Sequence, residues 1–243
     1  MKYAFLSFAL LPGLAATAAA QTYGFETDLS GWTTGGNVAI EDASTFGPTA
    51  TEGSSYVVLD TGDRTVDMDF GATPTPNPTG VTAADLGLGL DKSTLDAAFS
   101  IDSYDLSYLS RTFTVNAGDT ITFDWKFLTN EFPDAFNEFN DTAFFATSFG
   151  DLGALAQVNS ASYMDFPSAI VSYESDWMSG SITATSSGSM TLLFGVVDDG
   201  GNEVASMLAV DNLTITAVPE PSTYAALAGL GVLGLVVLRR RRQ

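Results

Sequence analysis

The sequence predicts an all-β fold, a single jelly-roll-type β-sandwich with one or two short helices. Short runs of β-branched and aromatic residues recur along the chain, separated by Gly, Asn, Asp and Pro, which is the pattern of strands joined by turns. Only residues 82–99 have the composition of a helix. No internal repeat is visible, so propellers and solenoids are not expected. Many short strands in one domain-sized segment favour a sandwich.

The predicted strands are these β-branched and aromatic runs. From Thr120 to Phe127, aromatic and aliphatic residues alternate with polar ones, so one face is expected to be buried and the other mostly polar. Glycine-containing turns follow at 115–120 and 186–190. We expect strands over Val38–Glu41, Ser55–Leu59, Arg111–Val115, Thr120–Phe127, Ala143–Ser148, Ser181–Ala184, Met190–Val197 and Ala209–Ala217.

The helical segment runs from Thr82 to Phe99. Gly87 and Gly89 interrupt it, so two short helical pieces are expected. A Pro-rich segment over residues 71–80 precedes it and is expected to be an exposed loop.

The N-terminal residues have the layout of a secretory signal peptide. Lys2 supplies a positive charge, Tyr3–Ala16 is almost entirely apolar, and Ala18–Ala20 offers a small-residue cleavage site. We therefore expect residues 1–20 to direct export and residues 21–217 to form the folded ectodomain. Residues 218–243 are expected to form a separate C-terminal tail.

The tail combines an uncharged span with a basic end. Thr223–Leu238 carries no charge, and Arg239–Arg242 follows it. As a helix this span reaches roughly 24 Å, which is short for a hydrocarbon core of about 30 Å. The arginines would hold its end on the cytoplasmic face. A short transmembrane helix with a basic stop suits a temporary anchor, and an ordinary tail anchor is the alternative.

The start of this tail is more specific. The stretch "VPEPS", Val218–Ser222, followed by the Gly- and Ala-rich span and the arginines, resembles the PEP-CTERM sorting signal of Gram-negative bacteria. In that family an exosortase recognises the Pro-Glu-Pro motif, here Pro219, Glu220 and Pro221, and removes the tail. The resemblance implies a protein anchored in the inner membrane before processing, and then located at the cell surface or in the extracellular polysaccharide matrix.

Composition excludes several classes of function. Of the 29 acidic residues only Glu220 lies outside residues 21–217, and five of the nine basic residues lie in the two ends, so the ectodomain carries 28 negative and 4 positive charges, a net of −24. Such a chain repels nucleic acid and anionic lipid. There is no Cys and no His, which removes disulfides, His-ligated zinc, and Ser-His-Asp or Cys-His catalysis. Clustered carboxylates instead suggest Ca²⁺, which takes oxygen ligands.

Two short stretches form a second resemblance. "YGFETDLSGW" (Tyr23–Trp32) and "MLAVDNLTIT" (Met207–Thr216) resemble the first and last strands of jelly-roll carbohydrate-binding modules with the galactose-binding-like fold. The resemblance implies that the terminal strands are adjacent and that Glu26 and Asp211 bind a structural Ca²⁺, with backbone carbonyls completing the shell. The alternative is that both residues only cap strand ends.

A third acidic segment lies between two aromatic runs, within Phe123–Phe145. Its oxygen-bearing side chains suit a second cation site or a polar ligand loop, and a solvated acidic loop is the alternative. Together with Leu192–Ile215 it resembles a recurrent ectodomain type of PEP-CTERM proteins. Asp198–Glu203 is interpreted first as a hairpin turn, with a cation site as the alternative. The candidate metal ligands of this segment are Asn130, Glu131, Asn140 and Asp141, with Asp134, Asn137 and Glu138 beside them.

These observations favour a non-enzymatic exported protein that is structural or weakly glycan-binding. A dedicated, calcium-stabilised carbohydrate-binding module is the first alternative. A glycoside hydrolase is the second, because Glu131 and Glu138 could act as a carboxyl pair, although no glycosidase signature surrounds them. Ice binding is not favoured, since regular Thr arrays are absent. The candidate sugar-stacking residues are Phe132, Phe136, Phe139, Tyr163 and Trp177.

Overall fold

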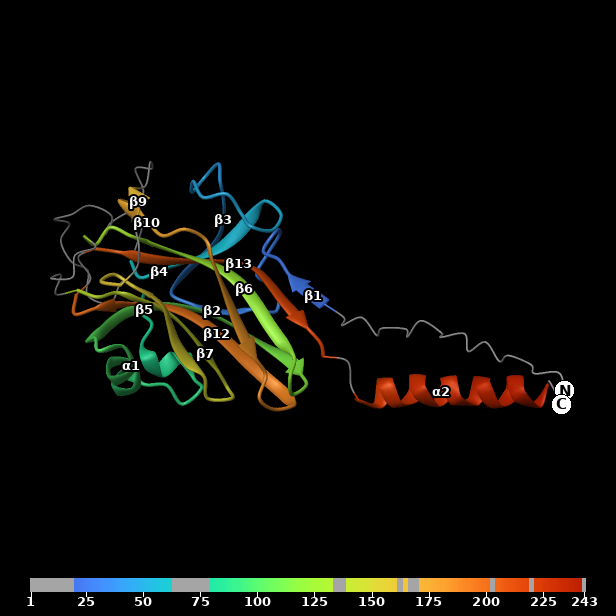
Figure 1. Ribbon diagram of the computed structural model, residues 1–243. Helices are drawn as coiled ribbons and strands as arrows, with labels where there is room; N and C mark the ends of the chain where they lie inside the picture. The colour runs from blue at the N-terminus through green and yellow to red at the C-terminus, as the bar shows by residue number, and fades with distance from the viewer. Residues whose placement is uncertain are drawn as a thin grey trace.

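The computed structural model describes residues 20–62, 79–132, 139–160, 164–165, 171–201, 204–218 and 221–241. Its body consists of two antiparallel β-sheets packed face to face, and one helix extends away from one end of this body (Figure 1). The jelly-roll-type β-sandwich predicted from the sequence is therefore confirmed.

The larger sheet is organised around its two longest strands, β6 (Thr120–Thr129) and β13 (Ser206–Thr216), which pair with each other over most of their length. β13 pairs on its other side with β4 through its first half and with β1 through its second half, and a register shift between Asp211 and Thr214 separates the two. The strands of this sheet are β1 (Ala20–Tyr23), β3 (Asn37–Asp42), β4 (Ser55–Asp60), β6 (Thr120–Thr129), β9 (Met164–Asp165), β10 (Tyr173–Glu174), β11 (Met178–Thr183) and β13 (Ser206–Thr216).

The smaller sheet has the order β2-β5-β12-β7-β8. Its centre is the long pairing of β5 with β12, which is interrupted by a register shift between Val197 and Asp199. The strands are β2 (Thr33–Gly35), β5 (Ser103–Val115), β7 (Thr142–Thr147), β8 (Leu152–Gln157) and β12 (Gly188–Asp199).

The main core lies between the two sheets and contains side chains from both. Phe123 of β6 and Phe194 of β12 meet edge to face, with ring centroids 4.7 Å apart. Ile121 and Phe127 are buried as the alternation of β6 predicts. The opposite face of β6 differs from the prediction, because Lys126 is buried as well. Glu174 and Ser175 lie against it there.

The outer faces of both sheets are also covered. The 3₁₀ helix η1 (Ala83–Leu86) and helix α1 (Lys92–Phe99) pack against the smaller sheet, where Phe99 contacts Phe144 with ring centroids 5.5 Å apart. On the larger sheet, Tyr56 and Leu128 lie beneath Phe46 and Val171. A flat open sheet face is therefore not available as a ligand platform over these areas.

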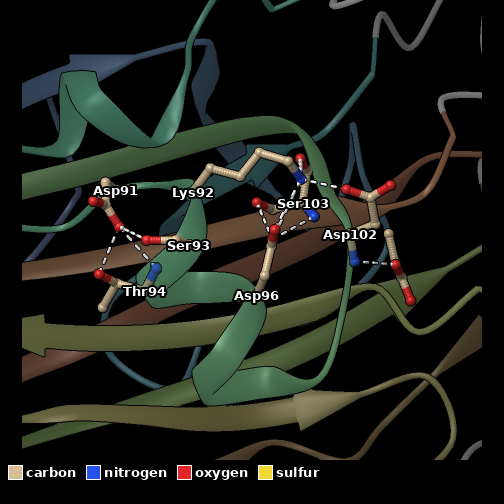
Figure 2. Close-up of polar contacts among 8 residues, drawn as sticks. Asp91, Lys92, Ser93, Thr94, Asp96, Asp102 and Ser103 are labelled. Carbon is tan, nitrogen blue, oxygen red and sulfur yellow. Dashed lines mark hydrogen bonds and ion pairs between the residues drawn. The ribbon is translucent and has the colours of Figure 1, made fainter.

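The two helical pieces confirm the predicted break. Gly87 and Gly89 between them have φ angles of +65° and +74°, which glycine adopts without strain. α1 begins at an N-cap, since Asp91 Oδ1 accepts a 2.8 Å hydrogen bond from Thr94 N (Figure 2). It ends at Ser100 in the left-handed conformation.

The two ends of the ectodomain lie side by side, because β1 pairs with β13. This confirms the predicted adjacency of the terminal strands. The tail forms helix α2 (Pro221–Arg240), which projects from the sandwich (Figure 1). In the part of the chain that the structure describes, no helix has both the length and the hydropathy needed to cross a membrane. Residues 1–19 of the predicted signal peptide and the motif residues Pro219 and Glu220 lie outside the described residues, whereas Ala20 is the first residue of β1.

Candidate functional site

One end of the sandwich holds a cluster of buried polar side chains, which we call the acidic end. It forms where β4, β6 and β12 end and where β5, β7 and β13 begin. The strands bring together residues that are far apart in the sequence. The acidic end consists of Asp60, Thr61, Asp105, Ser107, Thr129, Asp141, Asp198, Asp199 and Ser206, all of them buried.

Asp141 is the centre of its hydrogen bonding. Asp141 Oδ2 accepts a 2.5 Å hydrogen bond from Ser206 Oγ, and Asp141 Oδ1 accepts a 3.0 Å bond from Asp199 N. Ser206 Oγ is also 2.8 Å from Thr129 Oγ1, and Ser206 N donates to Thr61 Oγ1 over 3.0 Å. These contacts connect the two sheets at this end.

Asp141 and Asp198 form a carboxyl pair. Burial raises the pKa of Asp141 to about 6. Burial, followed by the charge of Asp141 and those of Asp105 and Glu131, raises the pKa of Asp198 well above its ordinary value. Two adjacent buried carboxyl groups do not ionise together. Burial and mutual repulsion therefore both favour the protonated form of this pair.

The predicted ligand residues of the central segment lie in or around this end. Asn140 N donates to Asp199 Oδ2 over 3.0 Å, and its Oδ1 accepts from Asn159 N. Asn130 Oδ1 accepts a 3.1 Å hydrogen bond from Ser172 Oγ. Glu131 N donates to Thr129 Oγ1 over 2.9 Å. The remaining candidates, Asp134, Asn137 and Glu138, lie outside the described residues.

Of the nine residues of the acidic end, Asp141 alone was among the predicted ligands, and Asp198 and Asp199 were assigned first to a turn. Asp198 and Asp199 are the last residues of β12, not the start of a hairpin turn. The available signal was that they continue the apolar run of β12 without a break. Asp105 lies in β5 ahead of the predicted strand at Arg111–Val115. Nothing in its local sequence distinguishes it from a surface aspartate.

Lys92 fixes helix α1 beside this end (Figure 2). Its Nζ lies 3.1 Å from Asp96 Oδ2 and 2.5 Å from Asp102 Oδ1, and it donates to the carbonyl oxygen of Ser103 over 2.6 Å. Asp102 N in turn donates to Asp199 Oδ1 over 2.7 Å. The start of β5 is thus held on one side by α1 and on the other by the acidic end.

Glu26 and Asp211 hold one loop between them. Asp211 Oδ2 accepts from Thr51 N over 2.7 Å and from Glu52 N over 2.8 Å. Glu26 Oε2 accepts from Ser54 N over 2.9 Å. The hydrogen bond from the Ser54 backbone lowers the pKa of Glu26, whereas burial raises the pKa of Asp211. The structure thus brings the two predicted ligands to one site, as caps of residues 51–55.

Among the described residues, no group of three or more acidic side chains is arranged to hold a metal ion. At Glu26 and Asp211 a Ca²⁺ shell would need backbone carbonyls in addition to the two carboxylates. Ca²⁺ binding there and at Asn130, Glu131, Asn140 and Asp141 therefore stays a prediction.

The aromatic candidates divide into exposed and packed residues. Phe132 is 62% exposed and lies edge to face with Tyr173, with ring centroids 6.0 Å apart. Phe139 is 37% exposed and lies against Gly200 and Gly201. Trp177, by contrast, packs on Tyr56 and donates from Nε1 to Thr49 O over 2.9 Å. Phe136 and Tyr163 lie outside the described residues.

Residues 217–242 match the PEP-CTERM protein-sorting motif, which confirms the sorting signal expected from the tail. Comparison with curated proteins gave no match.

Solved structures with a similar chain path include binding modules and an adhesin domain. The CBM27-1 module of Caldicellulosiruptor saccharolyticus in complex with mannohexaose is 11% identical, with a TM-score of 0.40, covering 81% of this chain and 96% of that chain. The xylan-binding domain CBM22-1 of Paenibacillus barcinonensis is 15% identical, with a TM-score of 0.35 and coverages of 85% and 99%. The K1 cleaved adhesin domain of Lys-gingipain from Porphyromonas gingivalis is 15% identical, with a TM-score of 0.42 and coverages of 83% and 99%. These similarities assign no ligand to this chain.

Proposed function

We propose that this chain is an exported, non-enzymatic surface or matrix protein that is anchored through its C-terminal tail and then separated from it by an exosortase. The observation that carries the proposal is the PEP-CTERM match at residues 217–242, which begins directly after β13. The exposed apolar side chains of α2, such as Leu230 and Leu233, support a membrane-anchoring role before processing.

We further propose that the ectodomain binds extracellular polysaccharide weakly at its acidic end. β13 has 11 residues, so at about 3.3 Å per residue its two ends lie roughly 35 Å apart. Ser206 at its first end belongs to the acidic end, whereas Val218 follows its second end. In an anchored protein the acidic end would face away from the membrane, where a matrix polymer is accessible.

Phe132 and Phe139 are the residues proposed to contact sugar. Both rings are exposed at this end, and the two segments that carry them flank the strand ends of the acidic end. Aromatic rings offer a large apolar face at a small cost in conformational entropy. A dedicated, calcium-stabilised carbohydrate-binding module remains the alternative to weak binding, and the two differ only in affinity and ligand definition.

A glycoside hydrolase is less well supported by this geometry. Its two carboxyl groups must face a sugar ring across a cleft. Asp141 and Asp198 are instead buried and in contact with each other, and of the predicted pair Glu131 and Glu138 only Glu131 is described.

The sorting proposal is tested with the double substitution Pro219→Ala, Glu220→Ala. We expect this variant to stay in the membrane fraction at full length, while the parent is processed and released. Thr223→Ala, next to the motif, is the matched control and should be processed like the parent. Equal release of the double variant and the parent would refute sorting through the motif.

The glycan proposal is tested by affinity electrophoresis of the released ectodomain against a panel of neutral, acidic and amino polysaccharides. For a retarding polymer, Phe132→Ala and Phe139→Ala should each weaken binding roughly 2- to 12-fold, the range of one aromatic contact. Met178→Ala removes another exposed apolar side chain, from β11, and should have no effect. The proposal fails if no polymer retards the parent or if the two Phe variants bind as the parent does.

A further inference from the structure

The chain is held to the sandwich immediately before the sorting motif. Val218 N donates a 2.9 Å hydrogen bond to Asp119 Oδ1. Asp119 lies in the turn between β5 and β6 and is only 3% exposed. Its second carboxylate oxygen, Oδ2, accepts a 2.8 Å bond from Asn116 N. One buried carboxylate therefore closes the turn and binds the residue that precedes Pro219.

The turn is itself a firm support. Gly118 N donates to Ala184 O, and Ala184 N donates to Asp119 O, each over 2.8 Å. The side chain of Val218 lies over Gly118, because a Cβ built on this glycine would be 3.6 Å from Val218 Cγ2. Val218 is thus held by a hydrogen bond to the Asp119 carboxylate and by an apolar contact with Gly118. Both partners lie in a turn whose backbone is hydrogen-bonded to Ala184.

Little free chain separates the sheet from the motif. Thr216 is still paired, with Thr120 on one side and Ala20 on the other. Only Ala217 and Val218 stand between it and Pro219. An enzyme that cuts a peptide chain has to bind an extended segment through its backbone groups, and the N–H of Val218 is already engaged by Asp119.

We propose that Asp119 is a positioning residue for tail removal: it holds Val218 against the sandwich, and this contact has to open before the processing enzyme binds the chain around the motif. The inference rests on the proposed sorting function. The contact limits the rate of processing, because the enzyme acts on the fraction of molecules in which Val218 is released.

The test compares Asp119→Ser with Asp28→Ser in cells that process the parent. A serine hydroxyl still accepts from the N–H that closes a turn, but it lacks the second oxygen that reaches Val218. Asp28 caps a loop in the same manner, accepting from Ser30 N over 2.8 Å, and is the matched control. In a pulse-chase measurement the full-length form of Asp119→Ser should disappear several-fold faster than that of the parent, and Asp28→Ser should follow the parent.

Amide hydrogen exchange of the full chain in detergent micelles supplies a readout independent of processing. The Val218 amide should exchange roughly tenfold faster in Asp119→Ser, since a hydrogen bond to a charged acceptor is lost, and the Ile121 and Phe123 amides should keep the parental rate. If the Val218 amide of Asp119→Ser exchanges faster but the variant is processed no faster than the parent, the proposal is overturned. It is also overturned if the Val218 amide of this variant exchanges at the parental rate. If instead the Pro219→Ala, Glu220→Ala variant is processed normally, the sorting function itself is wrong.

Discussion

Asp141 and Asp198 lie side chain to side chain at the junction of the two sheets, and both are buried. Asp141 precedes β7 and Asp198 nearly ends β12, so their contact depends on the correct packing of two strands that belong to one sheet. Asp141 also accepts from Ser206 of the other sheet. The state of this carboxyl pair should therefore affect the stability of the whole sandwich.

The first prediction concerns the pH dependence of this pair. The pKa values of both groups are raised above the ordinary value of 3.8 in the folded protein, so the folded state binds more protons than the unfolded state. The stability that this contributes is fully present below pH 3.8. It is lost as the pH rises through about 6 for Asp141, and further as Asp198 ionises at higher pH.

Asp198→Asn keeps the shape of the side chain and a hydrogen-bond donor to Asp141, but removes the titration. At pH 8 we expect it to raise the free energy of unfolding by about 1–3 kcal/mol, the order of magnitude for an uncompensated buried polar group, and at pH 4 to have little effect. Urea unfolding from pH 4 to 9 measures the difference. Asp28→Asn, on an exposed loop, is the control. A difference that does not change with pH would contradict the prediction.

The second prediction concerns the buried ion pair of the larger sheet. Lys126 Nζ lies 2.9 Å from Glu174 Oε2, with the two side chains 5% and 15% exposed, and also donates to the carbonyl oxygen of Ser175. Lys126→Met should destabilise the fold by about 3–5 kcal/mol, because it leaves a buried carboxylate without its counter-charge. The double variant Lys126→Met, Glu174→Gln should recover part of this loss. Urea unfolding measures these free energies, and equal values for the parent and Lys126→Met would contradict the prediction.

Strand positions followed from local sequence where a strand has one apolar face. The predicted Thr120–Phe127 corresponds to β6, and the predicted Met190–Val197 corresponds to β12, each extended by a few residues. The edge strands β2 and β8 were not predicted. Gly and Thr or Ala dominate them, and they are strands because a neighbouring strand pairs with them, which local sequence does not encode.

The candidate site was predictable only in part for the same reason. Asp141 was expected among the candidate ligands, and it lies at the centre of the acidic end. Its partners Asp105 and Asp198 are distant in sequence, and only the β5–β12 and β12–β7 pairings bring them to it. The proximity of Glu26 and Asp211 was predicted from the resemblance of the terminal strands. The loop that joins them, residues 51–55, was not.

The third prediction is that Ca²⁺ stabilises the fold through Glu26 and Asp211. The two carboxylates hold the same loop, and the ectodomain carries a net charge of −24 from its 28 acidic and 4 basic residues. A bound divalent cation would therefore offset repulsion and tie the segment after β1 to β13. Burial raises the pKa of Asp211, and a bound cation would favour its charged form.

A cation that binds only the folded state stabilises it by about 2.7 kcal/mol at a free concentration 100 times its Kd, a rise in Tm of roughly 5–10 °C for a domain of this size. Metal-free ectodomain should show this rise in millimolar Ca²⁺ and lose it with chelator.

Glu26→Gln and Asp211→Asn lower the starting Tm, because each removes a charged cap of the loop. The informative quantity is therefore the Ca²⁺-induced shift in Tm, which should largely disappear in both variants. Asp141→Asn should retain the shift, and its loss there would place the ion at the acidic end instead. A Tm that responds to neither Ca²⁺ nor chelator in the parent would exclude a structural Ca²⁺ at both places, and Glu26 and Asp211 would then act only as caps of the loop at 51–55.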